Sequence, residues 1–400
     1  MGFSSALSSL HFWVAGVARL QCVEEKPNSG ESGYHCQLQL LIWTKHQPVL
    51  TVFFVVESTP IMMIVREVRT EDLDALWDLI GQANLGMTSL KIDKEQLADR
   101  IERSHFAFRR TNERAEGAPY VLVMQDTETG ALVGTSCIFS KTGGFEPFYA
   151  YRVVSEVIYC ERLKLTNETH SLHLVKIHNG PTEIGSLFLL PEYRGRGCGK
   201  LLSMSRFAYM AAHPKRFASH TIAEMRGNIG NDDSCPFWEA IGAHFFKIDF
   251  PSADSLSMID KQFIEDLMPR YPIYLELLPK DAVDSIGVVH DQTKPALAML
   301  EAQGFARNGL IDIFDGGPVV ECKTEDIAAI RRSRPYRLAH ENEFTNSIEN
   351  RRMAGCIVST SKSPLVSIQC DVRIANDCVM IDPICVEALG CKPGVTVWVT

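Results

Sequence analysis

One stretch decides the fold of this chain: Leu187-Phe188-Leu189-Leu190-Pro191-Glu192-Tyr193-Arg194-Gly195-Arg196-Gly197-Cys198-Gly199-Lys200. The apolar start predicts a buried strand, and the alternate glycines predict a tight turn. Apolar residues then recur at the spacing of one helix face, at Leu201, Met204, Ala208 and Ala211. A strand, a glycine-rich turn and a helix in this order predict a phosphate cradle, because the first N–H groups of a helix have no partner inside it and its dipole favours an anion.

The spacing of the glycines distinguishes between kinds of phosphate loop. A P-loop needs glycine at position 194 and Ser or Thr at 201, and a dinucleotide fingerprint from position 195 needs glycine at 200; none of the three is present. The pattern that fits is Arg-x-x-Gly-x-Gly, and it resembles the acyl-CoA loop of the GNAT superfamily of N-acyltransferases. We therefore expect the coenzyme to be bound by Leu187, Arg194, Gly195, Arg196, Gly197, Cys198, Gly199 and Lys200. An ordinary glycine-rich turn is the alternative, and the flanking strand and helix favour the cradle.

Composition limits the classes of function. A net charge of −9 argues against a nucleic-acid surface. The 12 cysteines lack C-x-x-C spacing and paired histidines, so we expect no metal site, no disulfide framework and a cytoplasmic location. The apolar run Leu38 to Val56 is broken by Lys45, His46 and Pro48, so we expect no membrane span.

The sequence divides into three parts. Residues 1–61 differ in composition from the rest of the chain and are expected to be a disordered extension or the product of an upstream start, with an extra module as the alternative. Residues 62–322 are predicted to form an α/β (α+β) acyl-CoA N-acyltransferase-like domain, a mixed sheet flanked by helices. Residues 323–400 are predicted to form a small β-rich domain, a barrel with a structural or dimer-forming role, and its weak resemblance to DNA-binding barrels is the less favoured interpretation.

Local patterns predict several elements of the central domain. We expect a helix over 94–108, a hairpin from 120 to 134, and strands over 183–190 and 221–225. Residues 235–242 and 298–305 share a pattern and are each expected to be a helix that leads into a strand. Such a pair would indicate a duplicated or elongated sheet.

Longer strings resemble one family, the arginine N-succinyltransferases of bacterial arginine catabolism. The matching strings, which lie within a resemblance running from Met63 to about Thr400, are Met87-Thr88-Ser89-Leu90, Pro147-Phe148-Tyr149-Ala150-Tyr151-Arg152-Val153, Ala223-Glu224-Met225-Arg226-Gly227, Ser234-Cys235-Pro236-Phe237-Trp238, Glu265-Asp266-Leu267-Met268-Pro269, Pro272-Ile273-Tyr274 and Ile311-Asp312-Ile313-Phe314-Asp315-Gly316-Gly317-Pro318. Together they are far more specific than the glycine loop.

The resemblance implies an activity and its partners. It implies transfer of a succinyl group from succinyl-CoA, the co-substrate, to the α-amino nitrogen of L-arginine, and some members of the family also accept ornithine. It also implies a homo- or hetero-oligomer with a related subunit. The family's succinyl-CoA contact in the E-x-x-x-L-F-L strand corresponds to Leu187, and its proposed proton donor in I-G-x-V-H corresponds to His290.

The chemistry gives each candidate a role and an alternative. His290 suits proton transfer because imidazole titrates near neutral pH, and a helix-capping or surface histidine is the alternative. A main-chain N–H at or near Leu187 is expected to stabilise the oxyanion, while its side chain packs in the core. Glu224 and Asp312 are candidates for binding the guanidinium of arginine, whereas Asp315 before two glycines is read as a turn residue.

The succinyl carboxylate needs a cation, for which Arg152 and Arg226 are candidates; pairing with neighbouring acids is their alternative role.

Two other functions remain open. One is an N-acyltransferase with a different acyl-CoA or amine, and the other is a non-catalytic acyl-CoA sensor.

Overall fold

The computed structural model describes residues 62–83, 93–144, 147–230, 234–257, 261–340, 343 and 351–400, and the backbone of three strands before them. The string from Met87 to Leu90 lies outside these residues. The chain divides into two compact units, Met1–Ile61 and Met62–Thr400. The first contains the antiparallel strands β1 (Ala18–Glu24), β2 (Cys36–Trp43) and β3 (Pro48–Val56).

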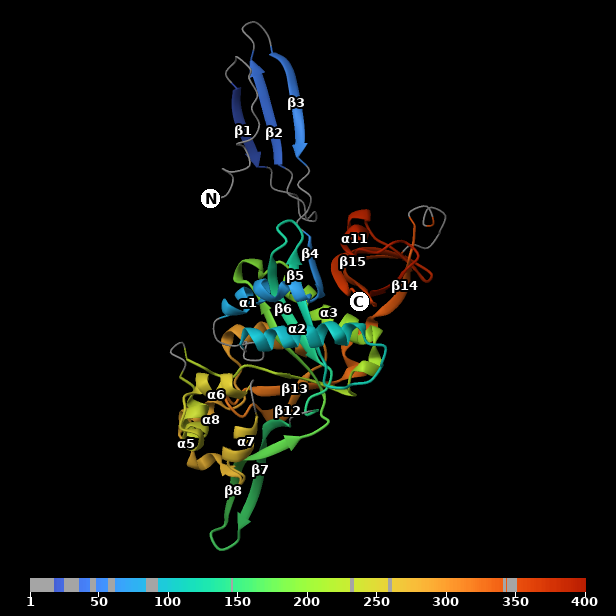
Figure 1. Ribbon diagram of the computed structural model, residues 1–400. Helices are drawn as coiled ribbons and strands as arrows, with labels where there is room; N and C mark the ends of the chain where they lie inside the picture. The colour runs from blue at the N-terminus through green and yellow to red at the C-terminus, as the bar shows by residue number, and fades with distance from the viewer. Residues whose placement is uncertain are drawn as a thin grey trace. The chain divides into compact units, whose positions relative to one another are not determined.

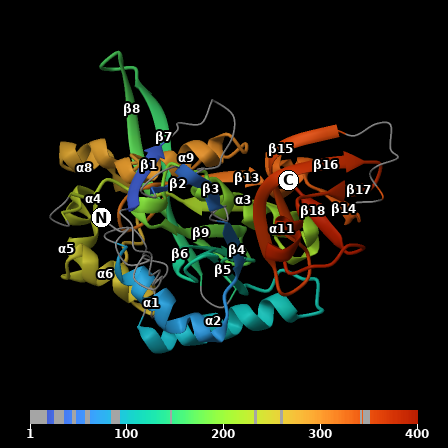
Figure 2. The same ribbon diagram turned by 90° about the horizontal axis from the view of Figure 1, so that it is seen from above.

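The second unit is built on one mixed sheet, drawn in Figures 1 and 2. The strand order among the described residues is β11-β8-β7-β12-β13-β10-β9-β6-β5-β4-β16-β15-β18-β14-β17. In chain order the strands are β4 (Met63–Glu67), β5 (Pro119–Asp126), β6 (Leu132–Phe139), β7 (Phe148–Cys160), β8 (Leu165–Ile177), β9 (Thr182–Leu189), β10 (His220–Glu224), β11 (Ile273–Tyr274), β12 (Ala306–Ile311), β13 (Pro318–Lys323), β14 (Arg334–Leu338), β15 (Arg351–Thr360), β16 (Val366–Ala375), β17 (Cys378–Met380) and β18 (Thr396–Val399).

Helices cover both faces of the central strands. They are α1 (Leu73–Gly81), α2 (Lys94–Arg109), α3 (Cys198–Ala212), α4 (Pro236–Ala240), α5 (Gly242–Phe246), α6 (Phe250–Ser257), α7 (Gln262–Leu267), α8 (Lys280–Ser285), α9 (Lys294–Glu301), α10 (Ala328–Arg332) and α11 (Pro383–Ala388). The predicted fold class, a mixed sheet with flanking helices and a β-rich C-terminal region, is confirmed. No helix of the described residues is both long enough and apolar enough to cross a membrane.

The two faces of the sheet have separate cores because side chains alternate along each strand. Val121 and Val123 of β5 pack with α1 and α2, while Tyr120, Leu122 and Met124 pack with α3. The start of α2 is fixed by a capping box, in which the Asp93 carboxylate accepts the N–H of Gln96 at 2.8 Å. The helix predicted over 94–108 is therefore confirmed.

The C-terminal strands form a closed barrel. The pairing runs from β16 through β15, β18, β14 and β17 and returns to β16, so every strand of the ring has two neighbours. The barrel shares β16 with the main sheet, where Val366 lies opposite Arg66 of β4. The predicted β-rich region is confirmed, whereas the division at residue 323 stays a prediction.

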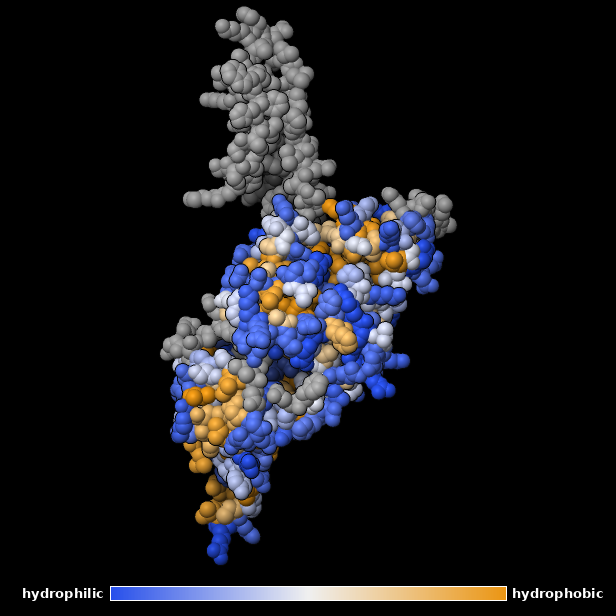
Figure 3. Space-filling model, viewed as in Figure 1, coloured by the Kyte–Doolittle hydropathy of each residue, from blue (hydrophilic) through white to orange (hydrophobic). Residues whose placement is uncertain are grey.

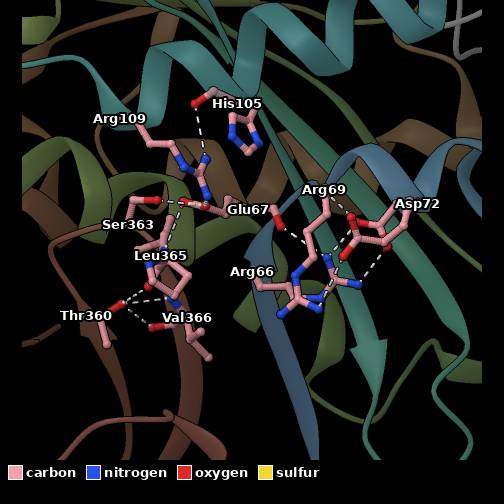
Figure 4. A network of polar contacts seen from close by, with 12 residues as sticks. Arg66, Glu67, Arg69, Asp72, His105, Arg109, Thr360, Ser363, Leu365 and Val366 are labelled. Atoms are coloured by element: carbon pink, nitrogen blue, oxygen red, sulfur yellow. Dashed lines mark hydrogen bonds and ion pairs between the residues drawn. The ribbon is translucent and has the colours of Figure 1, made fainter.

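A buried glutamate ties the barrel to the central sheet (Figure 4). The Glu67 carboxylate accepts hydrogen bonds from Arg109 at 2.7 Å, from the Ser363 hydroxyl at 2.8 Å and from the Leu365 N–H at 3.1 Å. Removing one partner of a buried, hydrogen-bonded charge is costly. This contact therefore fixes the segment before β16 to the end of β4 and to α2.

The two segments with a shared pattern behave differently. Residues 298–305 end α9 and lead into β12, as expected, and the sheet is elongated by β12, β13, β7 and β8. The expectation for residues 235–242 is wrong, because α4 leads directly into a second helix, α5. Gly242 lies against the Trp238 ring, where an added Cβ would be 2.1 Å from Cε3, so this glycine serves helix packing and does not begin a strand.

Candidate functional site

The glycine loop forms the predicted cradle at the end of β9. A single helical turn, Pro191–Tyr193, follows the strand, and α3 begins at Cys198. Gly195 and Gly197 have φ of +78° and +82°, a left-handed conformation that side chains other than glycine rarely adopt. The first helical N–H of α3 with a backbone partner is that of Leu201, which donates to the Gly197 carbonyl at 3.0 Å. The N–H groups before it are therefore available to an anion.

Positive side chains surround these amides. Arg194, Arg196 and Lys200 are all exposed, and the Arg194 Nε donates to the Leu189 carbonyl at 3.0 Å, which ties the loop to the strand. Within the described ranges no carboxylate lies within ion-pair distance of Arg196 or Lys200. Cys198 is different, since its thiol is buried in the core and burial raises its pKa, so only its backbone N–H faces a ligand.

The strand beside the loop is irregular where Leu187 lies. Opposite β6, the register of β9 shifts between Thr135 and Cys137, and Ser186 has a φ of +52°. Such a bulge turns a main-chain N–H out of the strand ladder. Leu187 is half-buried and its side chain packs against the core, which agrees with the expectation that only its main chain faces a ligand.

The sheet opens next to this bulge. The parallel strands β9 and β10 pair only through Thr182 with Thr221 and through Glu183 with Ile222. Beyond these pairs β9 continues beside β6 and β10 beside β13, so the two strands separate. A seam therefore opens between two central strands at the end of the sheet where the cradle lies.

His290 lies near the carboxyl end of β10. Its N–H donates to the Arg226 carbonyl at 2.9 Å, and its Nδ1 accepts from the Gln292 N–H at 3.3 Å at the start of a short helical turn. The capping role considered as an alternative is thus present in the structure. With Nδ1 accepting, Nε2 carries the proton of the neutral ring and is the atom able to donate. The catalytic role of His290 stays a prediction.

A cavity of about 700 Å³ lies against the seam. It is lined by Arg100, Arg103, Gly117, Phe139, Lys141, Thr142, Gly143, Gly144, Phe148, Tyr149, Glu183, Glu224, Asp254, Ser257, Lys261, Ile264, Asp312, Ile313 and Phe314. The lining combines four carboxylates with four cationic side chains. Such a mixture suits a small ligand that carries both signs of charge.

Three of the carboxylates are held in an unusual state. Burial, reinforced by neighbouring carboxylates, raises the pKa of Glu224 well above its usual value and that of Asp312 to about 8. Burial also raises the pKa of Glu183, with Lys261 and Arg100 opposing the shift. These carboxyl groups therefore hold their protons more tightly than exposed ones do, and a cation bound among them would favour their charged form.

The hydrogen bonds of these acids differ. Asp312 Oδ1 accepts the N–H groups of Phe314 and Asp315 at 2.7 and 2.8 Å, which fixes its position. The carboxylate of Glu183 bends toward Gly185, since a Cβ on that glycine would lie 3.7 Å from its Oε1. Glu224 is exposed, and it lines the open cavity.

The two arginines expected to bind the succinyl carboxylate, Arg226 and Arg152, are not among the residues that line the cavity. Arg226 pairs with Asp254 at 3.4 Å and with Asp315 at 3.6 Å, and Arg152 is exposed on β7 and does not line the cavity. Pairing with neighbouring acids, the alternative for Arg226, is thus observed, and binding of the succinyl carboxylate by either arginine stays a prediction. Asp315 accepts the N–H groups of Gly227 and Gly317 at 2.9 and 2.8 Å, so its interpretation as a turn residue is confirmed.

The sequence analysis missed several cavity residues. Glu183 was present in the quoted E-x-x-x-L-F-L string, and a charged residue at the start of an otherwise apolar strand was the available signal. Arg100 of α2, Asp254 of α6 and Lys261, the residue before α7, are distant from one another in sequence, and no local pattern marks them. The predicted Glu224 and Asp312 are brought together in this cavity.

The cradle, the seam and the charged cavity together have the geometry of a transferase that binds a phosphorylated carrier and a small charged acceptor. Comparison with known proteins agrees. The family model described as "Arginine N-succinyltransferase beta subunit" matches residues 63–329. The arginine N-succinyltransferases of Escherichia coli O17:K52:H18 and of Enterobacter sp. strain 638 are each 42% identical over 279 residues, which cover 70% of this chain and 81% of the relative.

A solved structure is also similar. The arginine/ornithine succinyltransferase subunit AI from Pseudomonas aeruginosa superposes with a TM-score of 0.75 at 29% identity, covering 85% of this chain and 98% of that one. On this evidence the chain belongs to the arginine N-succinyltransferase family, a family of acyltransferases.

Proposed function

We propose that this protein transfers the succinyl group of succinyl-CoA to the α-amino nitrogen of L-arginine. The observation that carries the proposal is the cluster of Glu183, Glu224 and Asp312 beside the seam between β9 and β10. A permanently charged cation bound among these carboxyl groups would stabilise their charged form, which their surroundings disfavour. The guanidinium of arginine is such a cation, because it stays protonated throughout the neutral pH range.

The cradle is the proposed site of the coenzyme A pyrophosphate. The free N–H groups between Gly195 and Lys200 and the positive end of α3 would hold its oxygens, with Arg196 and Lys200 adding charge. The pantetheine arm would then enter the seam and place the thioester beside Leu187. The N–H of Leu187 in the bulge would donate a hydrogen bond to the thioester oxygen as negative charge develops on it.

The cavity is the proposed site of the amino acid. Its acidic side chains would bind the guanidinium, and the cations Arg100, Arg103 and Lys141 on the same lining would face the carboxylates of arginine and of the succinyl group. Both substrates then meet at the seam. Ornithine, which also has a cationic side chain and an α-carboxylate, fits the same charge pattern.

The reaction needs two proton movements. The neutral α-amine attacks the thioester carbonyl, the C–N bond forms, and the C–S bond breaks as the tetrahedral intermediate collapses. We assign His290 Nε2 as the proton donor to the departing thiolate, because Nδ1 already accepts a hydrogen bond. The proton that the attacking nitrogen loses returns to the ring, so the imidazole is neutral again after each turnover. We also propose that the enzyme works in the cytoplasm as a homo- or hetero-oligomer with a related subunit.

A thiol-release assay tests the function. With succinyl-CoA we expect release of coenzyme A when arginine or ornithine is added, and little release with acetyl-CoA or with an uncharged amino acid such as alanine. Release with acetyl-CoA instead would favour a different acyltransferase. Binding of succinyl-CoA without release for any amine would contradict the proposal and favour a sensor.

A further inference from the structure

Exposed apolar side chains gather at one place on the molecule. The antiparallel strands β7 and β8 extend beyond the body as a hairpin, here called the arm (residues 154–171; Figures 1 and 2). Of the 13 large apolar side chains that are exposed among the described residues, five lie on the arm and four beside its root, so the clustering is not an effect of a generally apolar surface. The arm carries Val157, Ile158, Tyr159, Leu163 and Leu165, and the adjoining segment 267–277, here called the base, carries Leu267, Tyr271, Tyr274 and Leu277.

The base and the arm form one continuous surface. Tyr274 pairs with Ser171 of β8, and the Glu276 carboxylate accepts the N–H of His170 at 2.7 Å. Tyr271 and Leu277 next to them are 85% and 82% exposed. Figure 3 shows apolar surface on the hairpin and on the helical region above it. A patch of this kind marks an interaction surface.

The arm is apolar on both of its faces. Residues directly opposite each other in a hairpin share a face, so Val157 and Tyr159 lie on one face and Ile158 and Leu165 on the other. A partner that covers a single face would leave the other apolar side chains in water. A partner that buries all of these side chains therefore contacts both faces of the arm.

Both strands of the arm also have open edges. β7 pairs with β12 only through Tyr151 and Arg152, and β8 pairs with β11 only through Ser171 and Leu172. Along the rest of the arm, the described residues provide no further strand on either side. Long, apolar edges without a neighbour are templates for association with another chain.

We propose that two copies of this chain associate through their arms, each arm lying against the arm and the base of the other copy. The arm carries acids and bases side by side: Glu161 adjoins Arg162 and Lys164 at the turn, and Glu156 and Glu168 lie along the strands. A two-fold arrangement places the same surface against itself, so this mixture of charges is complementary to its own copy. A partner of one sign would instead meet like charges.

The dimensions agree with this arrangement. From Val154 to Arg162 the arm spans about 26 Å, at about 3.3 Å per residue, which is long enough to reach past a second arm toward its base. The 18 residues of the arm and the 11 of the base match the roughly 20–30 residues that each partner contributes to a stable interface. Tyrosines on both parts are typical anchors of such a contact.

Analytical ultracentrifugation of the full chain at micromolar concentration tests the proposal. We expect the protein to sediment as a dimer, and the variant Tyr159→Lys/Leu163→Lys to dissociate with a dissociation constant raised at least ~30-fold. The matched control is Phe106→Lys, which removes a side chain that is 72% exposed on α2, outside the patch, and should leave the dimer intact. Far-UV circular dichroism of each variant checks that the central fold is kept.

Other outcomes would overturn the proposal. A wild-type protein that stays monomeric at these concentrations would mean that the arm serves a different partner, and a Tyr159→Lys/Leu163→Lys variant that remains dimeric would mean that the contact lies elsewhere. Crosslinking adds a second measurement, made with Cys160→Ser in place because Cys160 is a free cysteine on the arm. A cysteine at Thr166 should form a disulfide between two copies of the chain under mild oxidation by air, whereas a cysteine at Thr127, exposed in the β5–β6 turn, should not. The reverse pattern would contradict the arm contact even if the protein were a dimer.

Discussion

The cradle and the cavity both present charged or polar groups to a ligand, but these groups come from different parts of the chain. The cradle uses main-chain N–H groups from one run of residues between Gly195 and Lys200. The cavity uses side chains from strands, helices and loops spread from Arg100 to Phe314. One site is local in the sequence, and the other exists only because the sheet brings distant segments together.

This difference separates the two halves of the proposed chemistry. Main-chain N–H groups recognise a diphosphate whatever acyl group is attached to it. In the proposed chemistry, the carboxylates with raised pKa values bind the amino acid and determine which amine is accepted. The comparison therefore predicts that changes in the cavity affect the amine, and changes in the cradle affect the coenzyme.

The largest effect is expected in the cavity. The variant Glu183→Gln/Glu224→Gln removes two carboxylates and should lower kcat/KM for arginine by about 10³-fold, because each lost charged hydrogen bond costs about 1.5–3 kcal/mol. The dissociation constant of succinyl-CoA, measured by calorimetry, should change by less than about 3-fold. The control Glu128→Gln alters an exposed acid of the β5–β6 turn and should have no effect. If the variant lost affinity for succinyl-CoA as strongly as activity toward arginine, the proposed division of labour between cavity and cradle would be wrong.

The next effect concerns His290, which lies beside the seam and serves neither site alone. His290→Asn keeps an acceptor for the Gln292 N–H but cannot transfer a proton, so kcat should fall by about 10²-fold or more while both KM values stay nearly unchanged. His244→Ala, an exposed histidine on α5, is the control. If His290→Asn turned over arginine normally and only His290→Ala were inactive, the residue would be a cap and not a catalyst.

A smaller effect is expected in the cradle. Gly197→Ala adds a Cβ at a φ of +82°, 3.4 Å from the Gln369 Oε1, and should raise KM for succinyl-CoA by about 10-fold, since left-handed backbone costs about 1–2 kcal/mol for alanine. KM for arginine should not change. Gly390→Ala places the same strain, at a φ of +62°, behind α11 in the barrel. Stability should fall in both variants, so a loss of coenzyme affinity in Gly390→Ala as well would show that the effect is not specific to the cradle.

The same contrast explains what could be predicted from the sequence. The cradle residues follow one another, so spacing alone indicated a strand, a turn and a helix. Arg100 and Lys261 reach the cavity only through tertiary packing, which no local pattern encodes. The arm was missed for another reason: its apolar side chains point to both faces, so the strand alternation that marks a half-buried sheet is absent.

One predicted element is wrong because a single close contact decides the local structure there. Residues 235–242 resembled a helix followed by a strand, yet the close contact of Gly242 with Trp238 turns the chain into a second helix. In contrast, Glu224 and Asp312 were found through strings that resemble the family, and the structure places both on the same cavity. Glu183 was quoted in such a string without a role, and the structure places it on the lining of the same cavity.

Calorimetry of arginine binding tests the central claim, that the guanidinium enters a cluster of partly protonated carboxylates. A cation lowers the pKa of each neighbouring carboxyl group, so groups such as Asp312, with a pKa of about 8, must release protons when arginine binds near pH 7. Affinity should therefore rise as the pH increases toward 8. In buffers of different ionisation enthalpy, we expect release of about one proton for the wild type and clearly less for Glu224→Gln. An identical proton count in the two proteins would contradict the account.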